Sequence, residues 1–579
     1  MSRPGADCLR RLPLTAGAPP GPRPAARRAG KPGAGAWLLR SGLLLLVALG
    51  AAVPGGSLAA RHRDEGLIQV QRLIHEWRID EAAAALSQLT RSRPREPEVE
   101  LLRGELQFLQ GDYEGASQAM RTALGSLHGA SADAQEARAM AELATATAEV
   151  TRGFVEQRSP QGHFILRFRR GRDEVLAPYA GEALEKARAA LGADFAGISP
   201  GDAALPSTPV RVEIYDEVAD LARVSTLTLR EIETSGTIAL CKWNRLMIVS
   251  PKALVRGYPW LDTLTHEYTH FIISRVSRNT VPIWLHEGLA KFEERRWRGP
   301  AGGALSPAME HLLAVALGKK RFITFEQMSP SMAKLPSQDD TALAFAEVYT
   351  VVEFLHGKLG WDGLRALLRE LAGGTPDLRA LATVYGAPFA AFDRAWKTWL
   401  RGRKLKSRAG LFTDKLQFKK APPGQKKPPV PGEEDDSGEL TDPRARNFVR
   451  LGGLLRARGR LLPAAVEYEK AQGLLGPTHP LLALKLARTY LDLGDADRAV
   501  ATLEPARELY SDLAGLNATL GSAWMRKGEL GKAAPFLEAA IATSPFDPSV
   551  HCGLAAIYGK LNNQNLGREQ AACTLLGGK

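Results

Sequence analysis

The sequence predicts an α+β domain that is flanked on both sides by all-α helical repeats. Apolar residues recur at helical spacing with a 34-residue period near both ends of the chain. Strand-like runs of β-branched and aromatic residues lie in the middle region, and a stretch rich in proline, lysine and acidic residues follows that region. At 579 residues the chain is too long for one hydrophobic core, so several domains are expected.

Residues 1–60 are predicted to be a leader. A basic stretch precedes an apolar run at 43–53, and small residues follow at 57–59 in an AxA-like arrangement, which is the order of a signal peptide. The run is shorter than the roughly 20 apolar residues of a typical membrane span. We therefore expect export to the periplasm or the extracellular space after cleavage. The alternative is an uncleaved leader that anchors the protein in the inner membrane through residues 41–53.

Charge and cysteine usage argue against two classes of protein. The net charge is +13, but residues 1–60 carry +7, residues 401–430 carry +9 and residues 431–442 carry −6. The positive charge therefore belongs to the leader and one short segment, which predicts no nucleic-acid partner. The four cysteines lie far apart or in the leader and lack CxxC spacing, so we expect neither a disulfide framework nor a thiolate zinc site.

Residues 61–152 are predicted to form helical repeats. The stretches RIDEAAAAL from Arg78 and DYEGASQAM from Asp112 resemble each other, and their alanines Ala82 and Ala116 lie 34 residues apart. This period is typical of helix-pair repeats. We expect two helix pairs and one further helix in this segment.

Residues 153–402 are predicted to form the α+β domain. Short runs of β-branched and aromatic residues predict strands, and longer amphipathic stretches predict helices. The expected strands lie at 163–168, 210–215 and 246–250. The expected helices lie around 174–190, 260–275, 283–297 and 341–370, with Asp262 or Thr263 as the N-cap of the second. This mixture of elements places the domain in the α+β class.

Residues 403–443 are predicted to be a flexible linker, because their proline, lysine and acidic runs cannot bury a core. In residues 444–579, four kinds of residue recur every 34 positions. They are Leu486, Leu520 and Leu554; Ala487, Gly521 and Ala555; Tyr490, Trp524 and Tyr558; and Ala465, Ala499 and Ala533. This segment resembles a tetratricopeptide (TPR) array of three to four units, and an unrelated helical bundle is the alternative. The resemblance implies a concave groove that binds a protein partner.

The stretch LTHEYTHFIISRVSRNTVPIWLHEGLAKF, residues 264–292, carries a candidate metal site. His266 and His270 are four residues apart on an expected helix, so both imidazoles can reach one ion at about 2.0–2.1 Å. Glu267 lies one residue round from them, close enough to contact a water on that ion. After a loop that can reverse the chain, a second apolar helix carries Glu287. Two histidines and one carboxylate leave a fourth position open, as in catalytic zinc sites.

The residues HEYTH at 266–270 and WLHEGLA at 284–290 resemble the gluzincin metallopeptidases, specifically their short peptidase-MA-like branch. The resemblance covers roughly residues 160–400 and implies a thermolysin-like mini-gluzincin domain. It also implies that His266, His270 and Glu287 bind one Zn²⁺, while Glu267 is the general base. The stretch LCKWNRLMIVSP from Leu240 is similar to the edge strand that lies beside the metal in this group.

The same resemblance suggests roles for residues around the metal. Larger gluzincins have an acidic residue four positions after the ligand glutamate, where this chain has Lys291, so Asp262 becomes the candidate to orient a histidine. Tyr349 is the candidate oxyanion donor by its position in the family pattern, and ordinary packing in an amphipathic helix is the alternative. His286 should point away from the ion, either beside a ligand or into solvent.

Two further expectations concern the surroundings of the site. Glu293 and Glu294 are expected on a solvated face. Met247, Ile248 and Val249 are expected to accept substrate as an added strand, which favours extended peptides.

The function that these residues predict is that of an exported zinc metallopeptidase. Water activated by the zinc would hydrolyse peptide bonds with Glu267 as the base, and the TPR modules would recruit the substrate or a partner. The alternative is a TPR scaffold or adaptor with an inactive, zinc-stabilised peptidase-like domain. A third hypothesis, core histidines without metal, would leave buried imidazoles and carboxylates in need of other partners.

Overall fold

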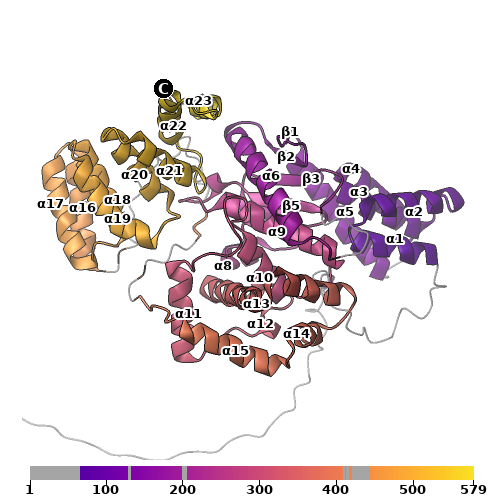
Figure 1. Ribbon diagram of the computed structural model, residues 1–579. Coiled ribbons are helices and arrows are strands. Elements are labelled where there is room, and N and C mark those ends of the chain that lie inside the picture. The colour runs from indigo at the N-terminus through magenta and orange to yellow at the C-terminus, as the bar shows by residue number, and fades with distance from the viewer. Residues whose placement is uncertain are drawn as a thin grey trace, which may run out of the picture. The chain divides into compact units, whose positions relative to one another are not determined.

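The computed structural model describes residues 65–127, 132–198, 205–408, 411, 416–419, 440 and 442–578. All of them belong to one compact unit, Leu44–Lys579 (Figure 1). The predicted leader at 1–60 and most of the predicted linker at 403–443 lie outside the described residues. Among the described residues, no helix combines the length and the apolar character that a membrane span requires.

The N-terminal segment forms two helix pairs and one further helix, as predicted. The helices are α1 (Glu65–His75), α2 (Ile79–Ser92), α3 (Pro97–Gln110), α4 (Tyr113–Ser126) and α5 (Ala132–Thr151). Gly111 ends α3 in the left-handed conformation, with φ of 84°, and the Asp112 side chain caps α4 by accepting from Gly115 N at 2.9 Å. The predicted repeat stretches therefore lie at the starts of α2 and α4.

The α+β domain contains a five-stranded mixed sheet with the order β1-β2-β3-β5-β4. Its strands are β1 (Phe154–Arg158), β2 (Phe164–Arg169), β3 (Val210–Tyr215), β4 (Ala239–Lys242) and β5 (Arg245–Val249). The three central strands β2, β3 and β5 are parallel to each other, and the outer strands β1 and β4 are antiparallel to their neighbours. The predicted strands match β2, β3 and β5 within one residue. β1 escaped prediction because three of its five side chains are exposed.

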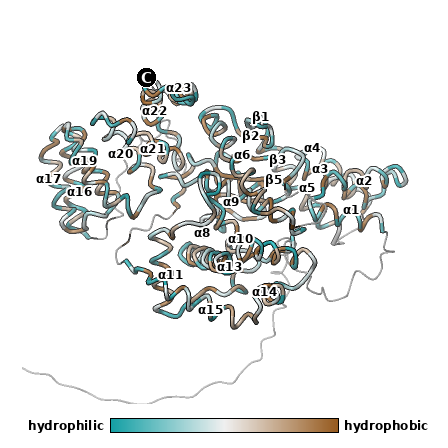
Figure 2. The backbone as a smooth tube through the Cα atoms, in the orientation of Figure 1, coloured by the Kyte–Doolittle hydropathy of each residue, from teal (hydrophilic) through white to brown (hydrophobic). Residues whose placement is uncertain are grey.

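Four long helices match the predicted helical stretches and cover the sheet or the site. They are α6 (Leu176–Asp194), α9 (Trp260–Ser277), α10 (Ile283–Glu293) and α13 (Gln338–Ala372). The remaining helical elements of the domain are η2 (Arg172–Val175), α7 (Val218–Arg223), α8 (Leu229–Ser235), η3 (Pro251–Ala253), α11 (Pro307–Lys319), α12 (Phe325–Met328), η4 (Met332–Lys334), α14 (Asp377–Tyr385) and α15 (Phe389–Gly402). The apolar positions that fill this core can be followed in Figure 2.

The C-terminal segment forms four helix pairs, at the upper end of the predicted three to four. The helices are α16 (Pro443–Ala457), α17 (Leu461–Leu475), α18 (Pro480–Asp492), α19 (Ala496–Leu509), α20 (Ala514–Arg526), α21 (Leu530–Ile541), α22 (Pro548–Leu561) and α23 (Leu566–Leu575). The repeated leucines Leu486, Leu520 and Leu554 are all buried between helices. The 34-residue period therefore corresponds to one helix pair.

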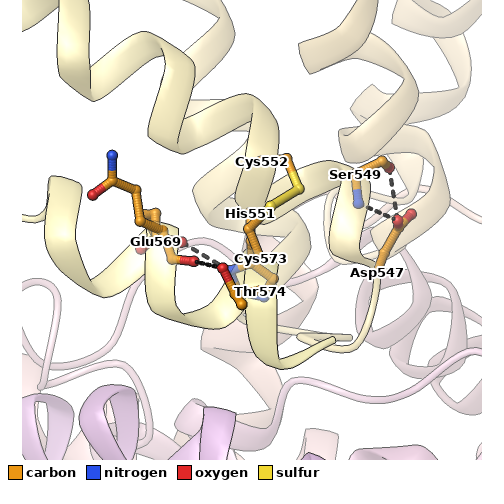
Figure 3. The surroundings of a disulfide bond; sticks show 8 residues. Asp547, Ser549, His551, Cys552, Glu569, Cys573 and Thr574 are labelled. Atoms are coloured by element: carbon orange, nitrogen blue, oxygen red, sulfur yellow. Dashed lines mark hydrogen bonds and ion pairs between the residues drawn. A yellow bond between two sulfur atoms is a disulfide. The ribbon is translucent and has the colours of Figure 1, made fainter. Parts of the chain in front are cut away.

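The expectation that the cysteines form no disulfide was wrong. Cys552 in α22 and Cys573 in α23 are bonded, with their Cα atoms 5.0 Å apart, and Figure 3 shows the bond between the two helices. The two residues are 21 positions apart in sequence. Their proximity arises because the last two helices fold back on each other, which the spacing of two cysteines does not reveal.

Both repeat segments contact the α+β domain through buried side chains. On the N-terminal side, the Tyr113 hydroxyl of α4 donates to Glu213 of β3 at 2.6 Å. The tip of the β4–β5 hairpin also enters this contact, because the Trp243 ring meets Phe108 of α3 edge-on at 5.5 Å. The N-terminal helices thus share a core with the sheet.

On the C-terminal side, the contacts come from the last two helix pairs. Trp260, the first residue of α9, donates from Nε1 to the Ile541 carbonyl of α21 at 3.0 Å. The Tyr179 hydroxyl of α6 donates to Glu569 of α23 at 2.7 Å. Figure 3 shows Glu569 near the disulfide. The other end of α9 is bound by the N-terminal helices, since Arg275 donates to the Trp77 carbonyl at 3.1 Å. Helix α9 is therefore fixed at both ends by the repeats.

Candidate metal centre

Helix α9 begins at Trp260, directly after Pro259. Asp262 lies in its first turn and is not the predicted cap; no side-chain cap is present at this end. The Asp262 carboxylate instead accepts from Trp297 Nε1 at 2.8 Å and pairs with Arg298. The suggestion that Asp262 orients a metal histidine was therefore wrong, because its side chain is bound to the segment that follows α10.

Helices α9 and α10 bring together His266, His270 and Glu287. Glu287 Oε2 lies 3.2 Å from His266 Nε2 and 3.3 Å from His270 Nε2, and the two imidazole nitrogens are 3.0 Å apart. In the described part of the chain, these three residues are the only group of three or more His, Cys, Asp or Glu side chains close enough to share an ion.

These spacings fit a tetrahedral ion. A tetrahedron with metal–ligand bonds of about 2.0–2.1 Å has edges of about 3.3 Å, and zinc sites prefer this geometry. The three observed donor separations of 3.0–3.3 Å lie close to that value. Two imidazoles and one carboxylate also form a donor set suited to zinc, so the residues present fit the metal.

A glycine lets α10 lie close enough to its neighbour to place Glu287. Gly288 packs against α13, where an added Cβ would lie 2.9 Å from the Val348 carbonyl oxygen and 2.8 Å from a Val352 methyl group. Such distances exclude any larger side chain without movement of α13 backbone. The glycine that follows Glu287 in the motif therefore has a packing role.

The charges in this group explain the pKa of each side chain. Burial tends to raise the pKa of Glu287, but the charge of His270 and hydrogen bonds from both histidines outweigh it and hold this pKa well below its usual range. Burial lowers the pKa of His266, in spite of its contact with Glu287. Burial also opposes the charged form of His270, but Glu287 and Glu267 raise its pKa. The ionised carboxylate thus faces the two imidazoles.

Glu267 is buried beside the same group. Burial, together with the charge of Glu287, raises its pKa to about 8, and a hydrogen bond from the backbone N–H of Cys241 acts in the opposite direction. Cys241 belongs to β4, so the edge strand of the sheet holds this carboxylate in place. Glu267 is not one of the three clustered donors, and its role as the general base stays a prediction.

His286 lies beside His270 and not in solvent. Its Nδ1 is 2.5 Å from Nδ1 of His270, and its Nε2 is 3.3 Å from the Ser274 hydroxyl oxygen. If Nε2 of His270 binds an ion, its Nδ1–H donates to His286, whose own Nε2–H donates to Ser274. Lys291, at the position where larger gluzincins have an acid, is engaged elsewhere and pairs with Glu294 at 2.7 Å.

His286→Ala is expected to weaken zinc binding about 10- to 100-fold, because His270 loses the partner that fixes its ring. The zinc dissociation constant, measured by competition with a chelating dye, checks this directly. Lys291→Ala is the matched control on the same helix and should leave the constant unchanged. An unchanged constant in His286→Ala would show that His286 does not orient His270.

The Tyr349 hydroxyl has a partner other than the three clustered donors. Its hydroxyl donates to the Gly303 carbonyl at 2.8 Å, and its ring lies 5.9 Å from that of Phe292. The residue of α13 that reaches the site is Phe345, one turn earlier, whose ring centroid is 6.0 Å from that of His266. The oxyanion role of Tyr349 stays a prediction, and it would require the hydroxyl to leave Gly303.

The expectation of a solvated face at Glu293 was wrong. This residue is fully buried at the end of α10, and neither carboxylate oxygen has a hydrogen-bond partner among the described residues. Burial and the nearby charge of Asp194 raise its pKa well above the usual value. Glu294 is partly buried and pairs with Lys291. The sequence predicted a solvated face because two adjacent acidic residues such as Glu293 and Glu294 usually face water.

The expected substrate strand also needs correction. Met247, Ile248 and Val249 lie in β5, which is paired with β3 on one side and with β4 on the other. Their backbone groups are therefore engaged within the sheet. The edge strand next to α9 is β4, so an added peptide strand would pair with residues 239–242 instead.

Comparisons with known families agree with this organisation. Residues 196–402 match the Peptidase MA superfamily, and residues 78–134 and 484–548 match the tetratricopeptide repeat. The chain thus contains a Peptidase MA superfamily domain together with TPR repeats. No curated protein matches the chain.

Similar solved structures include TPR proteins. MamA from Desulfovibrio magneticus RS-1 is 18% identical with a TM-score of 0.21, and the match covers 24% of this chain and 75% of that one. The thermophilic TPR protein TTC0263 of Thermus thermophilus is 24% identical with a TM-score of 0.21, covering 23% and 72%. A chain of the APC/C hetero-tetramer Cut9–Hcn1 is 10% identical with a TM-score of 0.25, covering 90% and 80%.

Proposed function

We propose that this protein is an exported zinc metallopeptidase of the gluzincin type, with a thermolysin-like mini-gluzincin domain. The observation that carries the proposal is the convergence of His266, His270 and Glu287, whose donor atoms lie 3.0–3.3 Å apart. The Peptidase MA superfamily match over 196–402 includes all three residues and supports a peptidase-like domain.

A zinc ion held by these three side chains would supply Lewis-acid activation of water and of the scissile carbonyl. In its ionised form, which the charge of a bound zinc ion would favour, Glu267 would take the proton from the attacking water and deliver it to the leaving amine. The hydrogen bond from Cys241 N–H fixes the orientation of this carboxylate. Because Glu267 is buried, it is shielded from bulk water until substrate and solvent enter the site.

An extended peptide is the proposed substrate. The backbone of β4 at 239–242 forms the sheet edge nearest to the metal helix, and Cys241 in this strand already contacts Glu267. A peptide that pairs with β4 would bring one of its carbonyls towards the base. The TPR repeats support protein–protein interaction as a second activity, with recruitment of substrate or of a partner as its purpose.

A TPR scaffold with an inactive, zinc-stabilised peptidase-like domain is the second candidate. Two observations favour it: the Tyr349 hydroxyl is bound to Gly303, and both repeat segments share buried contacts with the domain. In this case zinc would contribute to stability without turnover.

Metal removal distinguishes the two functions. Chelator treatment of the proposed peptidase is expected to abolish cleavage of a library of unstructured peptides, and one equivalent of zinc should restore it. If the protein is instead a scaffold, chelation should lower its melting temperature, and neither the zinc-bound nor the metal-free protein should cleave the peptides. Cleavage that persists in metal-free protein would contradict the proposed mechanism.

A further inference from the structure

The first helix pair of the C-terminal array exposes an unusual amount of apolar surface. Ten large hydrophobic side chains are exposed in the described part of the chain, and half of them lie on α16 and α17. They are Leu451, Leu454, Leu462, Val466 and Leu474, which are 38–63% exposed. Exposed apolar groups this numerous on one helix pair are typical of a binding site. We call these five residues and the arginines described next the arginine–leucine face.

The position of α16 and α17 in the array explains why this surface is open. Each later helix pair is covered by its neighbours, and the last pair is covered by the α+β domain through Tyr179 and Glu569. Among the described residues, no helix pair of the array precedes α16. The first pair therefore has one side without a repeat to cover it.

The charge on this face is strongly positive. Residues 443–460 contain six arginines and no acidic residue. Arg444, Arg446, Arg450, Arg458 and Arg460 are exposed. Arg450, Arg458 and Arg460 form no side-chain ion pair or hydrogen bond with any described residue. Arg456, in contrast, pairs with Asp492 at 2.6 Å. Within the part of the chain that the structure describes, these three cations have no bound anionic partner.

The arginines and leucines share one side of α16. With about 100° between successive helix residues, Arg450, Leu451, Leu454 and Arg458 all fall on the side opposite the buried residues Ala445, Val449 and Gly452. Figure 2 shows the alternation of hydrophilic and hydrophobic positions along α16 and α17. Leucines flanked by long basic side chains fit a surface that is apolar beneath an anionic layer.

We propose that the arginine–leucine face binds the surface of an anionic lipid bilayer. The leucines and Val466 would enter the boundary between headgroups and acyl chains, and the arginines would contact lipid phosphates. A second copy of the chain fits less well, since self-association through this face would bring together two sets of at least three unpaired arginines. The proposal does not depend on the peptidase activity.

Flotation of the full-length protein with lipid vesicles tests this proposal. Vesicles of phosphatidylcholine with phosphatidylglycerol should bind the protein, and binding should weaken as salt is added. Pure phosphatidylcholine vesicles should bind much less. The apolar run at 43–53 is present in every variant, so it cannot cause differences between them.

Three variants make the test specific. Arg450→Ser, Arg458→Ser and Arg460→Ser together should lower the partition coefficient by roughly two orders of magnitude, since each arginine near an anionic surface contributes about fivefold. Leu451→Ser with Leu454→Ser should lower it by at least about tenfold. Leu378→Ser with Arg379→Ser is the matched control, because these two exposed neighbours lie on α14. The control should bind as the wild type does, and all variants should keep the wild-type melting temperature.

Two results would overturn the proposal. The first is vesicle binding that is equal in the wild type and both face variants, which would assign it to another segment. The second is absence of vesicle binding together with a dimer, or a complex with an acidic protein, that the face variants abolish. That result would make the arginine–leucine face a protein interface.

Discussion

Glu267→Gln is expected to reduce peptide cleavage by roughly 10²- to 10⁴-fold, the usual contribution of a general base, while the protein keeps one zinc ion per chain. The amide has nearly the same size and can still accept the hydrogen bond from Cys241 N–H, so the fold should persist. It cannot take a proton from water, and this is the only function that the substitution removes. Steady-state cleavage of an unstructured peptide and metal analysis on the same sample provide the measurement.

The control for this experiment is Glu294→Gln. Glu294 lies at the end of α10 and pairs with Lys291, so its loss should change neither cleavage nor zinc content. If Glu267→Gln cleaves as fast as the wild type, Glu267 is not the base. If the substitution also removes the zinc, Glu267 has a role in binding the metal that the geometry does not indicate.

Glu213→Gln is expected to destabilise the protein by about 3–5 kcal/mol, the usual cost of breaking a buried ion pair. Glu213 and Arg245 are fully buried and lie 2.8 Å apart, and the carboxylate also binds Arg167 at 2.7 Å and the hydroxyls of Tyr113 and Tyr215 at 2.6 Å. The amide leaves the Arg245 guanidinium charged and uncompensated in the interior. A fall of roughly 5–10 °C in the melting temperature is the expected observation.

Two matched controls separate the effect of the buried charge from a general effect of losing a carboxylate. Asp497→Asn removes one partner of an exposed ion pair with Lys527 and should leave the melting temperature nearly unchanged. Glu213→Gln combined with Arg245→Met removes both charges and should recover part of the loss. An equal effect of Glu213→Gln and Asp497→Asn would show that the buried pair is not required.

The same pair predicts how stability depends on pH. Burial tends to raise the pKa of Glu213, but the charges of Arg245 and Arg167 and the two tyrosine hydroxyls hold it below its usual value in the folded protein. Because the folded pKa lies below the unfolded value of about 4.3, this stabilisation is present at neutral pH. It is lost as the pH falls from that value through the folded pKa.

Short-range patterns in the sequence were sufficient to predict that His266, His270 and Glu287 lie close together. The four-residue spacing of His266 and His270 fixes both rings on one side of α9, and the apolar stretch around Glu287 requires a second helix that packs nearby. The 34-residue period likewise predicted the helix pairs, since each column of leucines and alanines corresponds to one buried position. Periodicity is informative here because it reflects which side of a helix is buried.

Long-range polar contacts could not be predicted in this way. Tyr113, Glu213 and Arg245 come from three separate segments, and no local pattern indicates that they meet. For the same reason the disulfide between Cys552 and Cys573 was missed, and Glu293 was expected in solvent. The role of His286 was left between two alternatives, because its side-chain direction depends on how α10 packs against α9.

These contacts also change how the repeats are understood. The sequence suggested modules that recruit a partner, whereas the structure also shows them in contact with α9. Trp260 at the start of α9 is bound by α21, and Arg275 near its end is bound by the N-terminal helices. The positions of His266 and His270 therefore depend on both repeat segments.

Crystals grown with zinc and measured at the zinc absorption edge show whether His266, His270 and Glu287 hold the ion. We predict one anomalous peak between α9 and α10, at about 2.0–2.1 Å from Nε2 of His266, Nε2 of His270 and a carboxylate oxygen of Glu287. Two results would contradict this prediction: no peak at this position while zinc binds elsewhere, or a peak that Glu287 does not contact.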